Sequence, residues 1–368
     1  MQKYFRFSWV RTGVFLGLLG LVVFFNVMAP KFYFMANPTA YRPAPGTFTV
    51  HYVDVGHGDC TIIELPDGKI AIIDGGPANS VYWTKSAWPH VYDYINTRIR
   101  PKNNFIDYII NTHPHEDHVG GLIKIMERFR FGAFYGPFAE GAVPSFVPAA
   151  KRGYAKPIVE AGRIGDMARD GYEIQFHATA VVETGYVYDE GDQSAELNEF
   201  SPIISIRYRG SDGESVFFVT GDAGHLTENQ FIDPDLCPSA AALLAGQIDN
   251  LYLRIGHHGS RNSTGIPFIN FLTDGRGEMN RTAIVSLGWL YNHPHAEPIA
   301  NLTSAGFDII KTRDVGDIVV RLSQQNGAVF FFGYNNPPEL TGLWIAMYIA
   351  VVFGCFLNLS TYNRIVKT

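Results

Sequence analysis

Hydrophobic and polar residues alternate along short segments in the centre of the chain. Residues 48–54, 61–65 and 69–74 alternate as β-strands do, and Pro66-Asp67-Gly68 between the last two has the composition of a tight turn. Apolar runs or alternation predict further strands at 106–110, 172–176, 203–208, 215–220, 251–255, 283–287 and within 318–332. Helical spacing of apolar residues predicts helices at 91–98, 122–129 and 226–231, whereas residues 134–171 are interrupted by Gly and Pro and are predicted to be irregular. A meander followed by mixed strands and helices indicates an α/β sandwich, with two sheets covered by helices.

Two uncharged apolar segments lie near the ends of the chain. The 19 residues between Arg11 and Lys31 carry no charge, and neither do residues 340–363. Each segment is long enough to cross a hydrocarbon core of about 30 Å as a helix, so we expect transmembrane helices at 12–30 and 340–359. Basic residues flank both segments on their terminal sides: Lys3, Arg6, Arg11, Arg364 and Lys367. The positive-inside rule then places residues 1–11 and 360–368 in the cytoplasm, with the intervening chain outside it.

Other interpretations of these segments remain open. The first could be a cleaved signal peptide with its cleavage site near Ala36, and either could be a buried core helix. Residues 31–46 contain Pro38, Pro43 and Pro45 and are predicted to be a linker, which leaves 47–335 for the folded domain.

The composition excludes several classes of protein. With 46% hydrophobic and 17% charged residues, the chain is neither disordered nor of low complexity. Its 29 Lys and Arg against 35 Asp and Glu give a net charge of -6, which opposes broad attraction to nucleic acid or anionic lipid. Three cysteines without CxxC spacing indicate neither a disulfide scaffold nor a thiolate zinc site. The 12 histidines are therefore the unusual feature of the composition.

A dense polar group follows the strand predicted at 106–110. Residues 112–121 read Thr-His-Pro-His-Glu-Asp-His-Val-Gly-Gly, so three imidazoles and two carboxylates occur within six residues. If buried, each of these groups needs a hydrogen bond or a cation, and a divalent metal satisfies several of them together. Histidine nitrogen and carboxylate oxygen suit zinc, manganese or iron. The alternative is a solvated histidine-rich loop.

The spacing of His113, His115, Asp117 and His118 resembles the H-x-H-x-D-H signature of the metallo-β-lactamase superfamily. Residues 217–222 (Phe-Phe-Val-Thr-Gly-Asp) and 253–260 (Leu-Arg-Ile-Gly-His-His-Gly-Ser) match later motifs of that family in the same order. More narrowly, several segments are similar to the ComEC branch, the extracytoplasmic domain of DNA-uptake channel proteins: 53–59, 73–76, 257–260 with Ser263, and 292–295. The resemblance covers about residues 48–332 and implies a metallo-β-lactamase-like αββα sandwich.

The resemblance also implies two divalent metal ions, zinc or manganese. It assigns His113 and His115 to one ion and Asp222 to a bridging position, while the second ion takes Asp117, His118 and His257. The family's additional histidine, expected between His118 and Asp222, has no good counterpart, because His177 lies in a strand-like segment and is typical of a core residue. The ComEC branch carries Asn and Ser in this region, and Asn198 and Ser201 match them. We therefore expect weaker binding of the first ion.

Further residues near these motifs are candidates for catalysis and substrate binding. By analogy with the family, Asp117 orients the attacking water; His258 and His293, with His295, are candidates to protonate the leaving oxygen or bind phosphate. The predicted substrate-binding residues are Ser260, Arg261, Asn262, Ser263 and Asn292. Residues 259–263 could form the start of a helix whose N–H groups hold an anion. Alternatively, they could start an ordinary helix that is capped by a serine.

Four more residues are candidates to orient the metal ligands from behind: Asp54, His57, Asp74 and Asn198. Asp54 and Asp74 could instead be turn residues, and His57 a surface histidine.

Three classes of function follow from this resemblance. The leading one is a membrane-anchored, metal-dependent phosphodiesterase or nuclease that acts on DNA or a related phosphodiester outside the cytoplasm, at the inner or plasma membrane. The second is a hydrolase of a small carbonyl substrate, such as a lactone or β-lactam. The third is a DNA-binding or assembly module of an uptake system. Because two predicted spans cannot form the long multi-span conduit of ComEC, a separate membrane channel protein is an expected partner.

The two-span topology predicts that reporter proteins fused after Ala36 and at Thr368 lie on opposite sides of the membrane, because basic residues flank both ends. Paired alkaline phosphatase and green fluorescent protein fusions measure this directly. Both reporters on one side, or a mature chain that begins near Asn37, would contradict the two-span topology.

Overall fold

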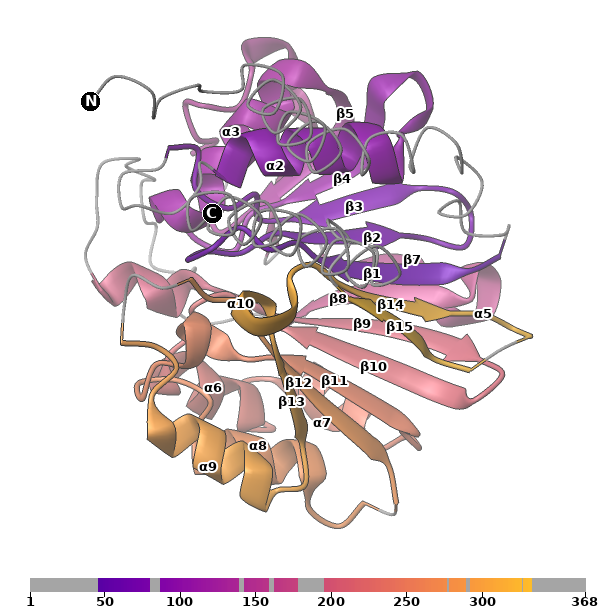
Figure 1. Cartoon of the computed structure of the whole chain (residues 1–368), viewed down its shortest axis with the longest axis vertical. Helices are drawn as coiled ribbons and strands as arrows, with labels where there is room; N and C mark the ends of the chain where they lie inside the picture. The colour runs from indigo at the N-terminus through magenta and orange to yellow at the C-terminus, as the bar shows by residue number, and fades with distance from the viewer. Residues whose placement is uncertain are drawn as a thin grey trace, which may run out of the picture. The chain divides into compact units, whose positions relative to one another are not determined.

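Two β-sheets packed face to face form the centre of the computed structural model, with helices on their outer faces (Figure 1). The structure describes residues 46–79, 87–138, 142–158, 162–177, 195–276, 278–288, 292–325 and 327–332. In spatial order the eight described strands of the first sheet are β15 (Val329–Phe332), β14 (Ile318–Leu322), β1 (Phe48–Tyr52), β2 (Thr61–Glu64), β3 (Ile70–Ile73), β4 (Phe105–Ile110), β5 (Arg130–Gly136) and β6 (Ala155–Pro157). The seven of the second sheet are β13 (Asp308–Lys311), β12 (Asn280–Val285), β11 (Asn250–Arg254), β10 (Gly213–Val219), β9 (Ile203–Gly210), β8 (Tyr172–His177) and β7 (Arg163–Asp166).

Helices connect these strands. The α-helices are α2 (Ala87–Tyr94), α3 (Glu116–Arg128), α5 (Met167–Asp170), α6 (His225–Ile232), α7 (Pro238–Leu244), α8 (Ile266–Thr273), α9 (Ala296–Ser304) and α10 (Thr312–Val315). A π-helix, η1 (Ile95–Ile99), continues α2, and short 3-10 helices form η2 (Lys102–Asn104), η3 (Ala149–Tyr154), η5 (Ala195–Phe200) and η6 (Gly256–Gly259). Helices α2 and α3 lie beside the first sheet, and α6 to α9 lie on the other side of the molecule, beside the second sheet (Figure 1).

Aromatic side chains fill the space between the two sheets. Phe48 of the first sheet stacks on Tyr208 of the second with ring centroids 5.0 Å apart, and Phe217 stacks on Tyr252 at 4.3 Å. A second apolar cluster, which includes Phe231, lies between the second sheet and α6 to α9. These two clusters bury the apolar face of each element, which stabilises the layered arrangement.

The directions of the strands bring the polar motifs to one edge. Strand β3 is parallel to β4, and β10, β11 and β12 are parallel to one another. The carboxyl ends of parallel strands meet at the same edge of a sheet. The segments after β3 and β4 therefore adjoin, and so do those after β10 and β11, where the backbone N–H of His257 donates to the carbonyl of Gly221 at 3.1 Å.

Helix α3 packs against the segment after β3 through three glycines. The N–H of Gly75 donates to the carbonyl of His118 at 2.8 Å, and the N–H of Gly121 donates to the carbonyl of Gly76 at 2.6 Å. A Cβ atom on Gly121 would overlap the carbonyl oxygen of Gly75. This close approach holds His118 beside the end of β3.

The predicted α/β sandwich with two sheets is confirmed, as is the antiparallel meander of β1, β2 and β3. The prediction that residues 134–171 are irregular is wrong in part, because they include β6, β7 and α5. These elements have only three or four residues each, too few for a periodic pattern to reveal. Strand β13, which lies at the edge of its sheet with no fully buried residue, was not predicted either.

The predicted spans at 12–30 and 340–359 lie outside the described residues, as do nearly all of the predicted linker and both predicted cytoplasmic ends. Within the described part of the chain, no helix has the length and apolar character needed to cross a membrane.

The contact between Gly75 and Gly121 predicts that Gly121→Ala lowers the free energy of unfolding by about 2 kcal/mol or more, because the added methyl group forces α3 away from β3. Gly153→Ala is the matched control, since a Cβ atom there meets nothing within 4 Å. Chemical denaturation of both variants measures the difference. Equal stabilities would contradict the proposed tight packing.

Candidate metal centre

The carboxylate of Asp74 organises the loop that carries the histidine motif. Asp74 follows β3 and has a backbone φ of 56°, in the left-handed region. Its oxygens accept hydrogen bonds from the backbone N–H of Thr112 at 2.8 Å and from the Thr112 hydroxyl at 2.6 Å. The same carboxylate lies 2.9 Å from Nδ1 of His118. Nδ1 therefore carries a proton, and Nε2 of His118 is left facing the site.

Two other imidazoles are fixed in the same way, through Nδ1. Nδ1 of His113 lies 3.1 Å from the Thr112 hydroxyl and 3.2 Å from the Ser201 hydroxyl. Nδ1 of His258 lies 3.0 Å from the carbonyl oxygen of Ser286, which can only accept a hydrogen bond. Nε2 of His258 is consequently available to a cation, and Nε2 of His113 faces Nδ1 of His115 at 3.1 Å.

Asp222 stands at the centre of the site, in the segment that follows β10. Its carboxylate oxygens lie 3.2 Å from Nε2 of His118, 3.6 Å from that of His258 and 3.8 Å from that of His113. Its backbone N–H donates to the Ser201 hydroxyl at 3.0 Å, which fixes the segment. Burial raises the pKa of Asp222, but the surrounding imidazoles outweigh burial and hold it well below its usual range, so the carboxylate is ionised.

The buried atoms at the centre fit divalent ions. Nε2 of His118, Nε2 of His258 and Oδ1 of Asp222 are buried and have no hydrogen-bond partner within the described ranges. Leaving such atoms unpaired is costly, and a cation satisfies all three. Two groups have ligand atoms within 4.8 Å of one another: His113, His115 and Asp222, and His118, Asp222 and His258.

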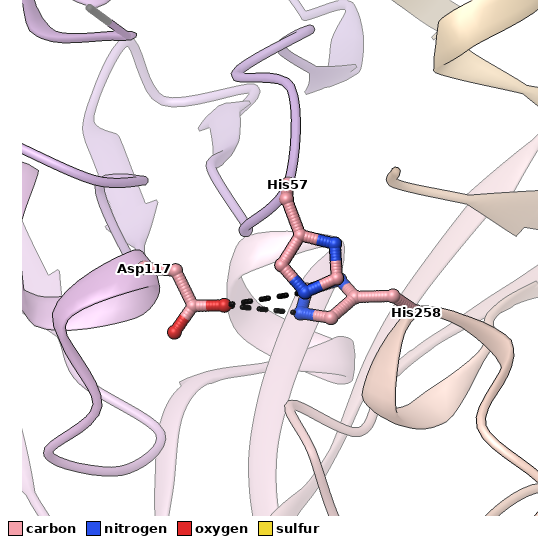
Figure 2. Close-up of side chains that lie close together, drawn as sticks. All are labelled: His57, Asp117 and His258. Atoms are coloured by element: carbon pink, nitrogen blue, oxygen red, sulfur yellow. Dashed lines mark ion pairs between the residues drawn. The ribbon is translucent and has the colours of Figure 1, made fainter. Parts of the chain in front are cut away.

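Asp117 and His57 add a third such group, together with His258 (Figure 2). Oδ2 of Asp117 lies 3.3 Å from Nε2 of His258 and 3.9 Å from Nε2 of His57, and the two rings lie 4.2 Å apart. Burial and the neighbouring His258 lower the pKa of His57 to about 2, so this imidazole is neutral at pH 7. His57 therefore lies against the candidate ligands and not on the open surface.

The two adjacent histidines of η6 differ in their placement. Both have a left-handed φ, 47° for His257 and 51° for His258. His258 is fully buried, whereas the His257 side chain is 25% exposed and its Nδ1 lies 3.4 Å from Nδ2 of Asn198. Nε2 of His257 is 3.7 Å from Asp222, but His257 belongs to none of the groups above. The geometry thus favours His258 as the ligand, whereas the sequence motif favoured His257.

The predicted substrate-binding residues fall into two sets. Arg261, Asn262 and Asn292 are exposed, and the His293 ring lies 5.7 Å from that of His257. Ser260 and Ser263 are buried within their loop instead. The Ser263 hydroxyl donates to the carbonyl of Gly256 at 2.7 Å, and the Ser260 hydroxyl accepts from the N–H of Asn262 at 3.3 Å. These two serines therefore shape the loop.

The start of α8 has its own carboxylate. Glu228 accepts hydrogen bonds from the N–H of Thr264 and, at 2.9 Å, from the N–H of Gly265. This carboxylate occupies the position where the predicted anion would bind. Asp54 likewise serves its own loop: its N–H donates to Asp317 at 2.8 Å, and its carboxylate accepts from the N–H of Gly56 at 3.2 Å.

Two residues of the site were not singled out from the sequence. Asp59 and Arg254 are buried and form an ion pair beside His118 and His258. Arg254 is the one charged residue of the strand Asn250–Arg254. A charge in such a strand is the sequence feature that could have identified it as a buried, paired residue. His177, by contrast, lies in the core as expected, 2.8 Å from the hydroxyl of Ser239 and 2.9 Å from that of Ser205.

Comparisons with known proteins agree with this geometry. Residues 53–265 match the family model described as the metallo-beta-lactamase superfamily. ComE operon protein 3 of Bacillus subtilis (strain 168) is 24% identical over 306 residues, which is 79% of this chain and 35% of that protein. The chain thus spans about a third of the length of that relative.

Solved structures with a similar fold include CmlA, a diiron beta-hydroxylase from Streptomyces venezuelae, with a TM-score of 0.43 and 15% identity over 76% of this chain and 55% of that one. A diphosphatase from the PhnP family has a TM-score of 0.39 and 14% identity over 75% of this chain and 99% of that one.

The placement of the two histidines predicts that Asp222→Ala and His258→Ala each lower the content of bound divalent metal by at least half, because each removes an atom of the central cluster. His257→Ala is the matched control and should keep the wild-type content. Metal analysis after purification without chelators measures this. Loss of metal in His257→Ala but not in His258→Ala would restore the assignment from the sequence motif, and wild-type content in Asp222→Ala would contradict the metal centre itself.

Proposed function

The chain belongs to the metallo-β-lactamase superfamily, and from this we propose that it is a metal-dependent hydrolase that cleaves DNA or a related phosphodiester. The observation that carries the proposal is the buried cluster in which Asp222 faces the Nε2 atoms of His118, His258 and His113. Such a cluster has little value for stability without a cation and is suited to metal-assisted hydrolysis.

The donor set divides into two ion positions that share Asp222. His113 and His115 would hold one ion with Asp222, and Asp117, His118 and His258 would hold the other with it. Zinc and manganese both suit these nitrogen and oxygen donors. When bound, the ions supply Lewis acidity, which lowers the pKa of a water molecule and polarises a phosphoryl oxygen. Among the described residues the first position has two histidines and Asp222, and this small donor set supports weaker binding there. The Ser201 hydroxyl lies behind the His113 ring, 3.2 Å from its Nδ1.

Asp117 is suited to orient the attacking water. Its side chain is 26% exposed, in contrast to the buried Asp222, and so reaches the open side of the cluster. Burial raises the pKa of Asp117, but the imidazoles of His118 and His258 outweigh burial and lower it below its usual range. Asp117 therefore accepts a hydrogen bond from water throughout the neutral pH range.

His257 and His293 are suited to contact the leaving group. Burial lowers the pKa of both, that of His293 to about 4, so their imidazoles are neutral at pH 7. A neutral imidazole can donate one hydrogen bond to a phosphate oxygen. Negative charge that develops on the leaving oxygen strengthens this hydrogen bond, so the neutral imidazoles stabilise that charge without giving up a proton.

Exposed polar residues near His257 and His293 in the chain support a phosphodiester over a small acyl substrate. Arg261, Asn262 and Asn292 are exposed hydrogen-bond donors, whereas an apolar acyl group needs an apolar lining. The net charge of -6 opposes tight binding to long nucleic acid, but bound ions and Arg261 offset it locally. The resemblance of residues 53–59, 73–76 and 257–260 to the ComEC branch of DNA-uptake proteins is a second support for DNA as the substrate.

A membrane-bound location belongs to the same proposal. The uncharged segments 12–30 and 340–359 with their basic flanks support an anchored chain whose catalytic domain faces the periplasm or exterior. A channel protein is then the expected partner. A purely DNA-binding module is the weaker candidate, because such a module has no need for metal ligands and this chain keeps most of those of the family.

The proposal predicts that the full chain, loaded with manganese or zinc, cleaves single-stranded DNA and bis-p-nitrophenyl phosphate, and that added salt weakens DNA cleavage. His115→Ala and Asp117→Ala should each lower the rate at least a hundredfold, since each removes a ligand and Asp117 also orients the water. Gel and absorbance assays measure the two reactions. Lys124→Ala on the exposed face of α3 is the control and should keep the wild-type rate.

A chromogenic β-lactam and a lactone serve as competing substrates in the same assay. Efficient hydrolysis of either, with both phosphodiesters left intact by the metal-loaded chain, would falsify the phosphodiester assignment and favour the acyl hydrolase.

A further inference from the structure

Arg254 is a charged side chain inside the second sheet. It ends β11, is 0% exposed and is the largest of the fully buried side chains. Its Nη2 pairs with the carboxylate of Asp59, and its Nη1 donates to the carbonyl of Gly221 at 2.9 Å. A buried guanidinium is costly unless it is paired, and replacement by an apolar residue is often neutral or stabilising. Stability alone therefore does not explain this pair.

Asp59 connects this arginine to the first sheet. It lies between β1 and β2, where its backbone N–H donates to the carbonyl of Asp117 at 3.1 Å and its carbonyl accepts from Gly76 at 2.6 Å. The ion pair thus joins the loop that carries Asp117 to the strand that precedes His258. Arg254 also holds the carbonyl of Gly221, the residue directly before Asp222.

The pair stands behind the imidazoles and does not replace their hydrogen bonds. The Asp59 carboxylate lies 3.6 Å from Nδ1 of His118 and 3.8 Å from Nδ1 of His258. Those two nitrogens already bind Asp74 at 2.9 Å and the Ser286 carbonyl at 3.0 Å, and the contact of Arg254 Nη2 with Nδ1 of His258 is longer, at 3.5 Å. Asp59 and Arg254 therefore act on the spacing of the segments and not on the tautomer of either ring.

We propose that Asp59 and Arg254 are positioning residues that set the distance between the two halves of the second ion's ligand set. Asp117 and His118 come from the first sheet, and Asp222 and His258 come from the second. An ion can bind all four only if the loops of both sheets are already held at the right separation, since otherwise ordering them opposes binding. The inference rests on the metal centre of the proposed function.

A simple charge effect and a positioning effect predict opposite results for one variant. Removing the positive charge in Arg254→Gln would favour a nearby cation if charge alone mattered. If the pair sets the spacing, Arg254→Gln and Asp59→Asn each weaken ion binding, and the double variant is no weaker than the weaker single variant. Arg254→Lys keeps the charge but cannot bind both Asp59 and Gly221 as the guanidinium does, so it is also weaker.

The test is a zinc titration of the metal-free full chain against a chromophoric chelator, with thermal unfolding of each metal-free variant measured alongside. We expect the affinity for one of two zinc ions to fall about tenfold or more in each variant, and that for the other to change by less than about threefold. Arg207→Gln is the matched control: it breaks an Arg–Glu ion pair with Glu214 in the same sheet and should leave both affinities unchanged. If Arg254→Gln does not fold, Arg254→Lys and Asp59→Asn carry the test.

Tighter zinc binding by Arg254→Gln, or a third bound ion, would overturn the proposal in favour of a charge effect. Unchanged affinities with lower unfolding temperatures would overturn it in favour of a purely structural pair. Because zinc binding is measured without substrate, its outcome is separate from the proposed reaction. A wild-type chain that binds two zinc ions but cleaves no phosphodiester contradicts the proposed function alone, and one that binds no zinc contradicts both.

Discussion

The burial of the Asp222 carboxylate among imidazoles is the constraint on which the rest of the site depends. A carboxylate removed from water is costly, and its neighbours His118, His258 and His113 face it with Nε2 while Nδ1 of each ring contacts another partner. The Asp74 carboxylate nearby is also buried, and its four hydrogen-bond contacts hold the histidine loop in place. These buried, close-set nitrogen and oxygen atoms have a cation as their natural complement.

The fold supports this costly arrangement with its two apolar layers. Asp74, His257 and His258 all have left-handed backbone conformations, each of which costs roughly 1–3 kcal/mol. The stacked aromatic pairs between the sheets and the cluster beneath α6 to α9 offset such costs. These three residues follow strands β3 and β11. The strands themselves therefore remain regular, while the segments after them adopt the conformations that the site needs.

The buried and exposed parts of the site have different tasks. The buried imidazoles of His118, His113 and His258 are each fixed through Nδ1, and together with the carboxylates they define the ion positions. Arg261, Asn262 and Asn292 are exposed, and substitution of an exposed residue changes few internal contacts. One kind of metal centre can serve different hydrolytic reactions. The exposed groups around it, and not the ions, therefore determine the substrate.

Local patterns in the sequence predict the layered α/β class, most of the strands and the histidine motif. Alternation is a local property of a strand, and His113, His115, Asp117 and His118 lie so close in the chain that their spacing alone identifies them. The sequence also pointed to Asp74, which ends a predicted strand, and to Asp222, through the resemblance of residues 217–222 to a family motif.

His258 turns inward and its neighbour His257 does not, because both have left-handed φ values in η6, and these values arise only in the folded chain. Likewise, nothing near Asp59 in the chain indicates Arg254, and the short strands β6 and β7 form only because a neighbouring strand is present. Contacts between segments remote in the chain leave no periodic pattern in either segment, so their partners become identifiable only when the two sheets are packed together.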